Sequence, residues 1–188
     1  MPAPVVITST ACVIVGPMRV RPPHDGDFAA LAAITNHYIA TTAVHFAYDA
    51  ITEAELRATW QRYGERFSWW VAERDGTIAG YAKSGTWRER AAYQWTAEVG
   101  LYVADRERGQ GIGRALYTAL LDELPRRGFR SAIAGITLPN DASIALHRAF
   151  GFTSVGVVED AGWKHGRWHA VEFWQKRFAT DGASPHGA

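Results

Sequence analysis

Apolar residues recur along the chain at two spacings, and together these spacings predict a mixed α/β domain built on one central sheet. Apolar residues from Phe28 to Tyr38 are three or four apart, which places them on one face of a helix that Asp25 or Asp27 caps. Similar spacing predicts further helices at residues 52–63, 109–124 and 141–150. Short apolar runs between turn residues predict strands at 18–21, 68–74, 77–87, 93–103, 131–136, 153–158 and 169–178.

Capping and turn residues support these element boundaries. Thr52 followed by Glu55 is a capping box, in which each side chain bonds to the main-chain N–H of the other residue. Asp75–Gly76 favours a two-residue turn between two strands, because both positions tolerate a positive φ. Pro125 and Gly128 mark the end of the helix that precedes them. The resulting order is strand, two helices, three strands, helix, strand, helix and two strands, with one sheet.

Length and composition are those of one globular domain. The chain has 188 residues with 20 basic and 19 acidic side chains, so the formal net charge is only +1. This charge excludes the broad basic surface that nucleic-acid binding requires. The single cysteine, Cys12, excludes an internal disulfide framework and favours a reducing, cytoplasmic environment.

The two ends of the chain differ in composition from the patterned region. Residues 1–17 hold no Lys or Arg, which argues against a signal peptide, and the apolar run 5–15 is too short to span a membrane. We therefore expect an N-terminal extension at 1–17, one domain at 18–178 and a flexible tail at 179–188. Met18 opens the first patterned stretch and is a candidate for the natural start.

The segment Arg108–Gly113, with the sequence Arg-Gly-Gln-Gly-Ile-Gly, is the strongest chemical signal. It follows a predicted strand and opens a predicted helix, where alternating glycines and free N–H groups favour an anion such as pyrophosphate. A P-loop is excluded because no Gly-Lys-Ser/Thr follows. A dinucleotide fingerprint is excluded because Arg114 or Leu116 stands at its last glycine. A glycine-rich turn without a ligand stays open on the local sequence alone.

This Arg-x-x-Gly-x-Gly pattern resembles that of the GNAT acetyltransferase superfamily, with Asn140 opening the next helix and Gly151–Phe152 closing it. The resemblance implies a single-domain GNAT fold, in which about four helices flank a mixed sheet and acetyl-CoA binds between two splayed strands. It implies main-chain contacts from alternate residues of 99–103. The residues that it assigns to the cofactor are Leu101, Val103, Arg108, Gly109, Gln110, Gly111, Ile112, Gly113 and Asn140.

Four separate blocks narrow the resemblance to the phosphinothricin N-acetyltransferase family, which also includes enzymes acting on methionine sulfone and methionine sulfoximine. The blocks are Asn-His-Tyr-Ile at 36–39, Trp-Thr-Ala-Glu at 95–98, Leu-Pro-Asn-Asp at 138–141 and Lys-His-Gly-x-Trp-His at 164–169. They lie in the family's order, and the likeness as a whole extends from about Met18 to Phe178. The resemblance implies a small amino-acid-like acceptor and a homodimer.

Two residues are candidates for the proton transfers of amide formation, in which the acceptor amine must be neutral and the thiolate must leave protonated. Glu98 lies within a strand among apolar neighbours, where desolvation raises a carboxyl pKa and makes a better base. Its position alone fits a structural ion pair equally well; the resemblance favours the base. His147 stands where the superfamily often has a Tyr general acid, although a lone helix histidine is commonly structural.

The acceptor is expected at the segment 87–93. Arg88 and Arg90 suit a carboxylate and a second oxygen-rich head group, because a guanidinium binds such groups in a bidentate way. A solvated hairpin tip is the plainer interpretation. The resemblance adds Tyr93 and Phe46 to the acceptor pocket. Arg88 stands where the family frequently has a lysine, so the resemblance does not specify which head group the acceptor carries.

The block 164–169 also contains two histidines at a spacing known from metal sites. His165 and His169 are four residues apart, but Gly166 and the strand context argue against a helix, and no cysteine or acid pair is near. We therefore expect no metal. The resemblance places His169 near the acceptor and the subunit contact.

Three functions remain from the sequence. The leading hypothesis is acetyl transfer from acetyl-CoA to the amino group of a phosphinothricin-like or methionine-derived amino acid, with no membrane or nucleic-acid partner. A protein or peptide N-acetyltransferase is the second, and the two arginines at the acceptor segment argue against it. A non-catalytic acyl-CoA sensor is the third, and the presence of Glu98 and His147 argues against it.

Overall fold

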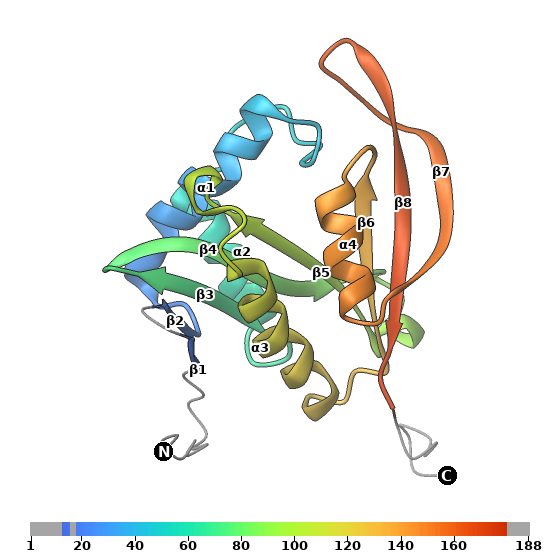
Figure 1. Ribbon diagram of the computed structural model, residues 1–188. Coiled ribbons are helices and arrows are strands. Elements are labelled where there is room, and N and C mark those ends of the chain that lie inside the picture. The colour runs from blue at the N-terminus through green and yellow to red at the C-terminus, as the bar shows by residue number, and fades with distance from the viewer. Residues whose placement is uncertain (1–12, 16–17, 180–188) are drawn as a thin grey trace.

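A computed structural model describes residues 13–15 and 18–179, and within them one mixed sheet carries eight strands in the order β1-β2-β3-β4-β5-β6-β8-β7 (Figure 1). The strands are β1 (Val13–Val15), β2 (Met18–Arg21), β3 (Trp69–Arg74), β4 (Thr77–Thr86), β5 (Thr96–Val103), β6 (Ser131–Thr137), β7 (Thr153–Lys164) and β8 (Arg167–Arg177). The helices are α1 (Phe28–Thr41), α2 (Glu53–Tyr63), α3 (Ile112–Arg126) and α4 (Asp141–Ala149). The expected mixed α/β class with four flanking helices is confirmed.

Two hydrophobic clusters pack against opposite faces of the sheet. One joins α1 and α2 to the β3 and β4 side chains Trp69 and Tyr81. The other joins the apolar stripe of α3, including Leu116 and Leu120, to small side chains of β4, β5 and β6. Consecutive strand residues point to opposite faces, so each central strand contributes to both clusters.

The parallel pair β5–β6 separates soon after it begins. Its paired residues are only Thr96–Glu98 with Ser131–Ile133, whereas β4 stays paired with β5 as far as Val103 and β8 with β6 as far as Thr137. Residues 99–103 and 134–137 therefore face each other without pairing. This divergence is the splay that the resemblance implies, and it opens the middle of the sheet.

Most local signals behave as expected. Thr52 and Glu55 form both bonds of the capping box, and α2 ends at Tyr63. Asp75 and Gly76 have φ values of 49° and 73°, as a tight turn between β3 and β4 requires. Asp27 stands at the N-cap of α1 but makes no side-chain cap; its carboxylate bonds to Arg21 and to the main chain of His24 instead.

Three predicted boundaries are wrong. The strand expected at 93–103 starts at Thr96, because the N–H of Tyr93 bonds to the carbonyl of Arg90 and closes a short 3₁₀ turn. The helix expected at 109–124 starts at Ile112, since two glycines before it have positive φ. Its last turn also includes Pro125, which has no N–H to donate to the preceding turn, and the helix ends one residue later at Arg126. The strand expected at 153–158 continues to Lys164 as β7.

The two ends of the chain lie mostly outside the described residues. Of the expected extension 1–17, the structure describes Val13–Val15, which pairs antiparallel with β2 at the edge of the sheet. The expected tail 179–188 lies outside the described residues except for Ala179. No helix in the described ranges is long and apolar enough to cross a membrane.

The β7–β8 hairpin extends beyond the sheet and contacts the segment 42–50 that follows α1 (Figure 1). The Lys164 ammonium, buried in this contact, donates to the carbonyls of Ile39 and His45 at 2.6 Å each. The hydroxyl of Tyr48 donates to the carbonyl of Trp163. These bonds fix the segment 42–50 above the open side of the sheet.

Candidate functional site

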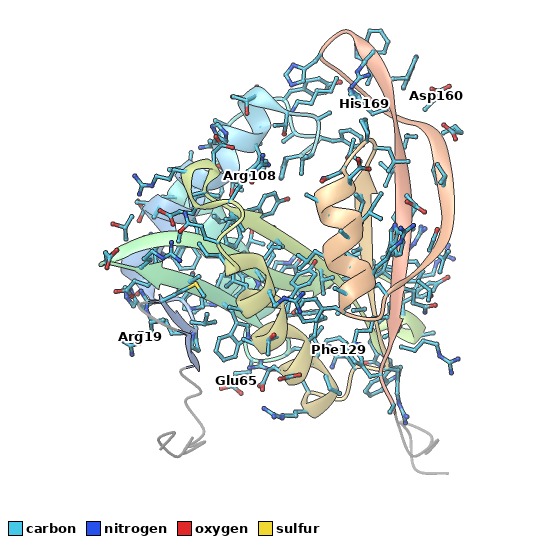
Figure 2. All side chains as sticks on the ribbon, in the orientation of Figure 1. Arg19, Glu65, Arg108, Phe129, Asp160 and His169 are labelled. Atoms are coloured by element: carbon cyan, nitrogen blue, oxygen red, sulfur yellow. The ribbon has the colours of Figure 1, made fainter. Side chains whose placement is uncertain are left out.

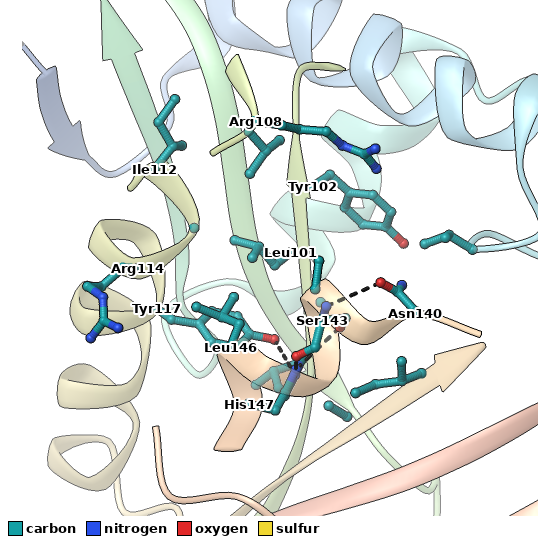
Figure 3. Close-up of a pocket in the computed structure, with 18 of the residues that line it drawn as sticks. Leu101, Tyr102, Arg108, Ile112, Arg114, Tyr117, Asn140, Ser143, Leu146 and His147 are labelled. Carbon is teal, nitrogen blue, oxygen red and sulfur yellow. Dashed lines mark hydrogen bonds between the residues drawn. The ribbon is translucent and has the colours of Figure 1, made fainter. Parts of the chain in front are cut away.

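A pocket of about 530 Å³ occupies the divergence of β5 and β6 (Figure 3). Its walls are residues 99–103 of β5, residues 134–137 of β6, the start of α3 and one face of α4. The pocket thus exists because two neighbouring parallel strands stop pairing. A slot between strands suits an extended ligand that can bond to exposed main-chain groups.

A glycine-rich loop forms one mouth of the pocket, just before α3. Gly109 and Gly111 both line it, with φ values of 74° and 80° that other residues adopt only under strain. A side chain at either position would meet no protein atom within 4 Å, so the space before them is free for a ligand. The unpaired N–H groups at the start of α3 face a negative group favourably.

Arg108 adds a cation at this mouth. Its guanidinium lies over the ring of Tyr38 at 5.5 Å and donates to the Tyr38 hydroxyl at 3.3 Å, so it extends from the loop toward α1 (Figure 2). Of the other predicted cofactor residues, Leu101, Val103, Ile112, Gly113 and Asn140 also line the pocket.

Gln110 differs from the rest of the loop. Its side-chain amide accepts from Arg74 and donates to the carbonyl of Arg106, and it does not line the pocket. The resemblance implies cofactor contacts from the main-chain amides of this loop, so the place of the Gln110 side chain leaves that prediction unchanged. Gln110 instead ties the loop to the end of β3, while the glycines on each side of it face the pocket.

Asn140 and Ser143 organise the start of α4 on the opposite wall. Asn140 is the N-cap, and its side-chain oxygen accepts from the N–H of Ser143 at 3.2 Å. The cap fixes the direction in which α4 enters the pocket wall. One turn later the helix presents His147, which is only 4% exposed.

Both ring nitrogens of His147 have partners (Figure 3). Nδ1 lies 2.7 Å from the carbonyl oxygen of Ser143, which can only accept, so Nδ1 carries the hydrogen. Nε2 then accepts from the Tyr117 hydroxyl at 3.0 Å. Burial lowers the pKa of His147, and the bond to Ser143 only partly opposes this, so the ring is neutral near pH 7.

Tyr117 is a pocket residue that the sequence analysis missed. It lies in α3 beside the apolar stripe, so the sequence pattern predicts an ordinary residue of the hydrophobic core. Burial raises its pKa, which keeps the hydroxyl protonated. The hydroxyl is therefore a donor on the pocket wall, with His147 behind it as its acceptor.

Tyr102 was missed as well, although a signal for it existed. It alternates along β5 with Glu98, so both side chains point to the same face. Its ring lines the pocket and stacks on Tyr81 at 5.3 Å. Burial raises its pKa to about 12.

Glu98 lies on β5 at the last residue pair before the strands separate, beyond the wall of the main pocket. Part of its side chain reaches solvent, but surrounding protein removes enough water from the carboxylate to raise its pKa. The positive charges of Lys83 and Arg88 oppose this rise. The desolvation expected from the sequence is confirmed, and no ion pair involves Glu98 among the described residues.

A second hollow, of about 250 Å³, lies beside Glu98. It is lined by Arg88, Glu89, Arg90 and Tyr93, so three of the four predicted acceptor residues meet in it. Arg88 rests over the ring of Trp87 at 5.2 Å, and Trp87 packs edge-on against Tyr93. The charge of Arg88 opposes the rise in the Glu98 pKa, so the two residues lie close enough to interact electrostatically.

Phe46 and His169 lie together under the β7–β8 hairpin rather than in either cavity. Phe46 packs against Gly162, where any added side chain would collide with its ring at 2.7 Å. Its ring is 6.3 Å from that of His169, whose Nε2 bonds to the carbonyl of Lys164 (Figure 2). His165 contacts the carbonyl of Thr42. Across residues 18–179, no group of three His, Cys, Asp or Glu side chains could hold a metal ion.

Comparison with known proteins identifies close relatives. Residues 31–152 match the Acetyltransferase (GNAT) family. The chain is 44% identical to a phosphinothricin N-acetyltransferase of Streptomyces viridochromogenes, over 86% of this chain and 88% of the relative. It is 34% identical to an L-methionine sulfoximine/L-methionine sulfone acetyltransferase of Salmonella typhimurium, over 84% and 93%. The structure of yncA from Salmonella typhimurium with acetyl-CoA superposes with a TM-score of 0.87 at 32% identity, over 92% and 100%.

Proposed function

The chain belongs to the GNAT acetyltransferase family, and from this we propose that it transfers the acetyl group of acetyl-CoA to the amino group of a small amino-acid-like acceptor. One observation carries the proposal. The slot between β5 and β6 has an anion-binding loop at its mouth, a hydroxyl donor in its wall and a carboxylate with a raised pKa just beyond it.

The residues present fit acetyl-CoA. The loop 108–113 offers main-chain donors at a helix N-terminus for a pyrophosphate, and Arg108 adds a positive charge. The facing edges of β5 and β6 offer unpaired main-chain groups to the amide-containing arm. Acetyl-CoA supplies the activated acetyl group, and the chain aligns it with the acceptor.

The remaining chemistry is proton transfer. Glu98 accepts a proton from the acceptor amine, either directly or through water, because its raised pKa brings it nearer to neutral pH. The Tyr117 hydroxyl lies on the slot wall and gives its single hydrogen to Nε2 of His147; to protonate the departing sulfur, the hydroxyl turns this hydrogen away from the ring and into the slot. His147 holds this hydroxyl in place through Nε2, so we assign it a positioning role.

The acceptor class follows from the relatives and from the second hollow. The names of the relatives specify phosphinothricin, methionine sulfoximine and methionine sulfone, which are α-amino acids with an oxygen-rich head group. Arg88 and Arg90 line a hollow of a size and charge that suit such a head. We propose the same acceptor class for this chain, with Phe46 supporting the hairpin that covers the acceptor.

We also propose that the protein is a cytoplasmic homodimer. The β7–β8 hairpin exposes a group of large apolar side chains, and a hydrophobic group on an edge strand favours an interface. These side chains are Val155, Val157, Val158, Trp163 and Trp168. The single cysteine and the cosubstrate both suit the cytoplasm.

The test of the proposed function is thiol release from acetyl-CoA with a panel of acceptors. The panel holds L-phosphinothricin, L-methionine sulfoximine, L-methionine sulfone, the common amino acids and a lysine peptide. A kcat/KM above about 10⁴ M⁻¹s⁻¹ for one of the three analogues supports the proposal. Preference for the peptide would overturn the acceptor class. Tight binding of acetyl-CoA without turnover of any acceptor would favour a sensor.

A further inference from the structure

Lys83 is a half-buried cation that the proposed chemistry has not yet used. It lies in β4 directly opposite Gly100 of β5, while Tyr81 pairs with Tyr102 and Gly85 with Glu98. Paired residues of antiparallel strands point to the same face. Lys83 therefore shares a face with Glu98 and lies between it and the aromatic pair Tyr81–Tyr102.

The stem of Lys83 lies across Gly100. Its Cγ and Cε would be 3.9 and 3.8 Å from a side-chain carbon added at Gly100, so the stem runs past this position at ordinary van der Waals distance. Gly100 itself lines the main pocket at the point where β5 leaves β6. The stem of Lys83 thus lies next to a pocket residue, and its ammonium lies over the ring of Trp69.

This ammonium has no anionic partner within residues 18–179. It lies over the ring of Trp69 at 5.3 Å, and neither a hydrogen bond nor an ion pair joins it to an oxygen there. The nearest acid that affects it is Glu98, which lies beyond ion-pair distance but opposes the lowering of its pKa by desolvation. Water reaches this half-buried ammonium only in part, so an oxygen anion that bonds to it would be stabilising.

The other cations near this point already have partners or lie farther out. Lys164 is held by two main-chain carbonyls. Arg88 faces the second hollow, on the other side of Glu98. Around Glu98 there are therefore two positive charges with separate positions, Lys83 beside the pocket and Arg88 in the hollow.

We propose that Lys83 binds the α-carboxylate of the acceptor, while Arg88 and Arg90 bind its distal head group; this inference rests on the proposed function. The reacting amine must reach the slot near Gly100, and in an α-amino acid the carboxylate is only two bonds from that amine. Lys83 is the cation nearer to the slot, so it pairs with the α-carboxylate, which is the acceptor's anion nearer to the amine. The distal head, several bonds away, then reaches the second hollow.

The assignment defines the substrate class more narrowly. An α-carboxylate that must pair with Lys83 selects free amino acids over peptides, whose first residue carries a neutral amide there. It also disfavours lysine side chains and simple amines, which have no anion beside the reacting nitrogen. With a peptide, a lysine side chain or a simple amine as acceptor, the Lys83 ammonium would have no carboxylate to bind.

The test compares two acceptors that differ only in this charge. The best acceptor from the panel, L-phosphinothricin or L-methionine sulfone, is assayed beside its α-carboxamide with wild type, Lys83→Met, Lys83→Arg and Arg88→Met. Lys83→Met should lower kcat/KM about 100-fold for the amino acid and less than about threefold for the carboxamide. Because each ratio is taken within one acceptor, the different amine pKa values cancel.

The variants separate the possible outcomes. Lys83→Arg should keep most of the preference for the carboxylate, and Arg88→Met should weaken both acceptors alike. An equal loss for both acceptors in Lys83→Met, or no loss for either, would overturn the inference, since a structural role or an effect on Glu98 acts on both. An unchanged Kd for acetyl-CoA verifies the fold of each variant. Wild type that turns over no amino acid would instead refute the proposed function itself.

Discussion

At the scale of single residues, the site combines a neutral hydrogen-bonded pair with a partly desolvated carboxylate whose pKa is raised. Tyr117 and His147 satisfy each other inside the wall, and Glu98 lies beyond it with two cations nearby. These three groups have different pH behaviour. Their contributions can therefore be separated by titration.

Replacing Glu98 by Gln should lower kcat/KM by a factor of about 10² or more, because only the proton acceptor is lost. In wild type, activity should rise with pH through a pKa above the ordinary value of 4.5, and the variant should lose this rise. Steady-state kinetics from pH 5 to 9 measure both effects. Turnover unchanged at pH 7 would exclude Glu98 as the base.

The thermal stability of Glu98→Gln should stay the same or rise, although its kcat/KM falls. The folded protein holds the Glu98 proton more tightly than the unfolded chain, so ionising Glu98 costs stability as the pH rises through the raised pKa. At pH 7 the Tm of Glu98→Gln should equal or exceed that of wild type. This distinguishes a catalytic loss from a folding defect.

His147 should make the protein less stable in mild acid. Its folded pKa is below 6.5, so as the pH falls through 6.5 the unfolded chain takes up a proton that the folded chain refuses. The free energy of unfolding should therefore fall, by up to about 1.4 kcal/mol per pH unit for this group. Urea titrations of wild type and His147→Gln at several pH values measure it.

A second histidine serves as the comparison. The pKa of His45 is also lowered, by burial and by the charges of Lys83 and Lys164, so His45→Gln should remove a similar part of the slope. A His147→Gln variant with the full wild-type slope would contradict a neutral, buried His147.

The residue scale shows where sequence reasoning works and where it stops. Glu98 was identifiable, because its place in an apolar strand predicts the desolvation that the structure shows. Tyr117 was not, since an aromatic beside an apolar helix stripe has the pattern of a core residue. The position of Lys83 beside Gly100 depends on the register between β4 and β5. The hydrophobic pattern within one strand does not specify that register, so the sequence did not predict this position.

At the scale of elements, the glycine loop before α3 should show a function separate from its conformation. Gly109→Ala costs about 1–2 kcal/mol of stability through its positive φ alone, because no protein atom lies near the new methyl group. It should also weaken acetyl-CoA binding, since the methyl group points into the free space of the loop. Isothermal titration and urea unfolding measure the two effects.

Gly166 is the matched control for this change. It has a φ of 75°, against 74° at Gly109, and equally open surroundings, but it lies in the β7–β8 turn. Gly166→Ala should cost similar stability and leave the Kd for acetyl-CoA unchanged. Equal effects of both variants on that Kd would argue against the loop as the pyrophosphate site.

The Lys164 ammonium makes two of the hydrogen bonds that join the hairpin to the end of α1 and the segment 42–50. Lys164→Met leaves the carbonyls of Ile39 and His45 without their donor, at a cost of about 1–3 kcal/mol for each buried group. We expect a lower Tm, faster proteolysis within residues 42–50 and a raised KM for the acceptor. Lys176→Met, which loses one bond to the carbonyl of Phe150, is the control for a lysine remote from this segment.

The sequence predicted an element well where one hydrophobic spacing continues along it. It predicted an element poorly where pairing with a distant strand sets the length. The helices and the strands β2, β3, β4 and β6 follow directly from spacing and capping residues. β7 exceeds its prediction because Gly156, Asp160 and Gly162 interrupt the apolar pattern. Its register with β8 is irregular at those places, and pairing with a long partner strand overrides the local sequence.

At the scale of the whole molecule, the exposed valines of β7 predict the assembly state. A homodimer through this strand should sediment at twice the chain mass of 20.7 kDa. Val157→Lys should shift it toward the monomer, because a charge in the centre of an apolar contact is unfavourable. Thr77→Lys, an exposed residue at the start of β4, should leave the mass unchanged. A wild type that stays monomeric at micromolar concentration would refute the dimer.

The early parting of β5 and β6 has a consequence for the durability of the protein. Within the part of the chain that the structure describes, β5 and β6 are joined by three residue pairs and by the bonds from the N–H groups of Arg130 and Ser131 to the carbonyl of Trp95. A molecule bound there contacts both parts of the sheet, so it stabilises the folded chain in addition to taking part in the reaction. At 100 times its Kd such a ligand adds about 2.7 kcal/mol to the free energy of unfolding. A cell that runs short of the acetyl donor therefore holds an enzyme that is both idle and easier to unfold.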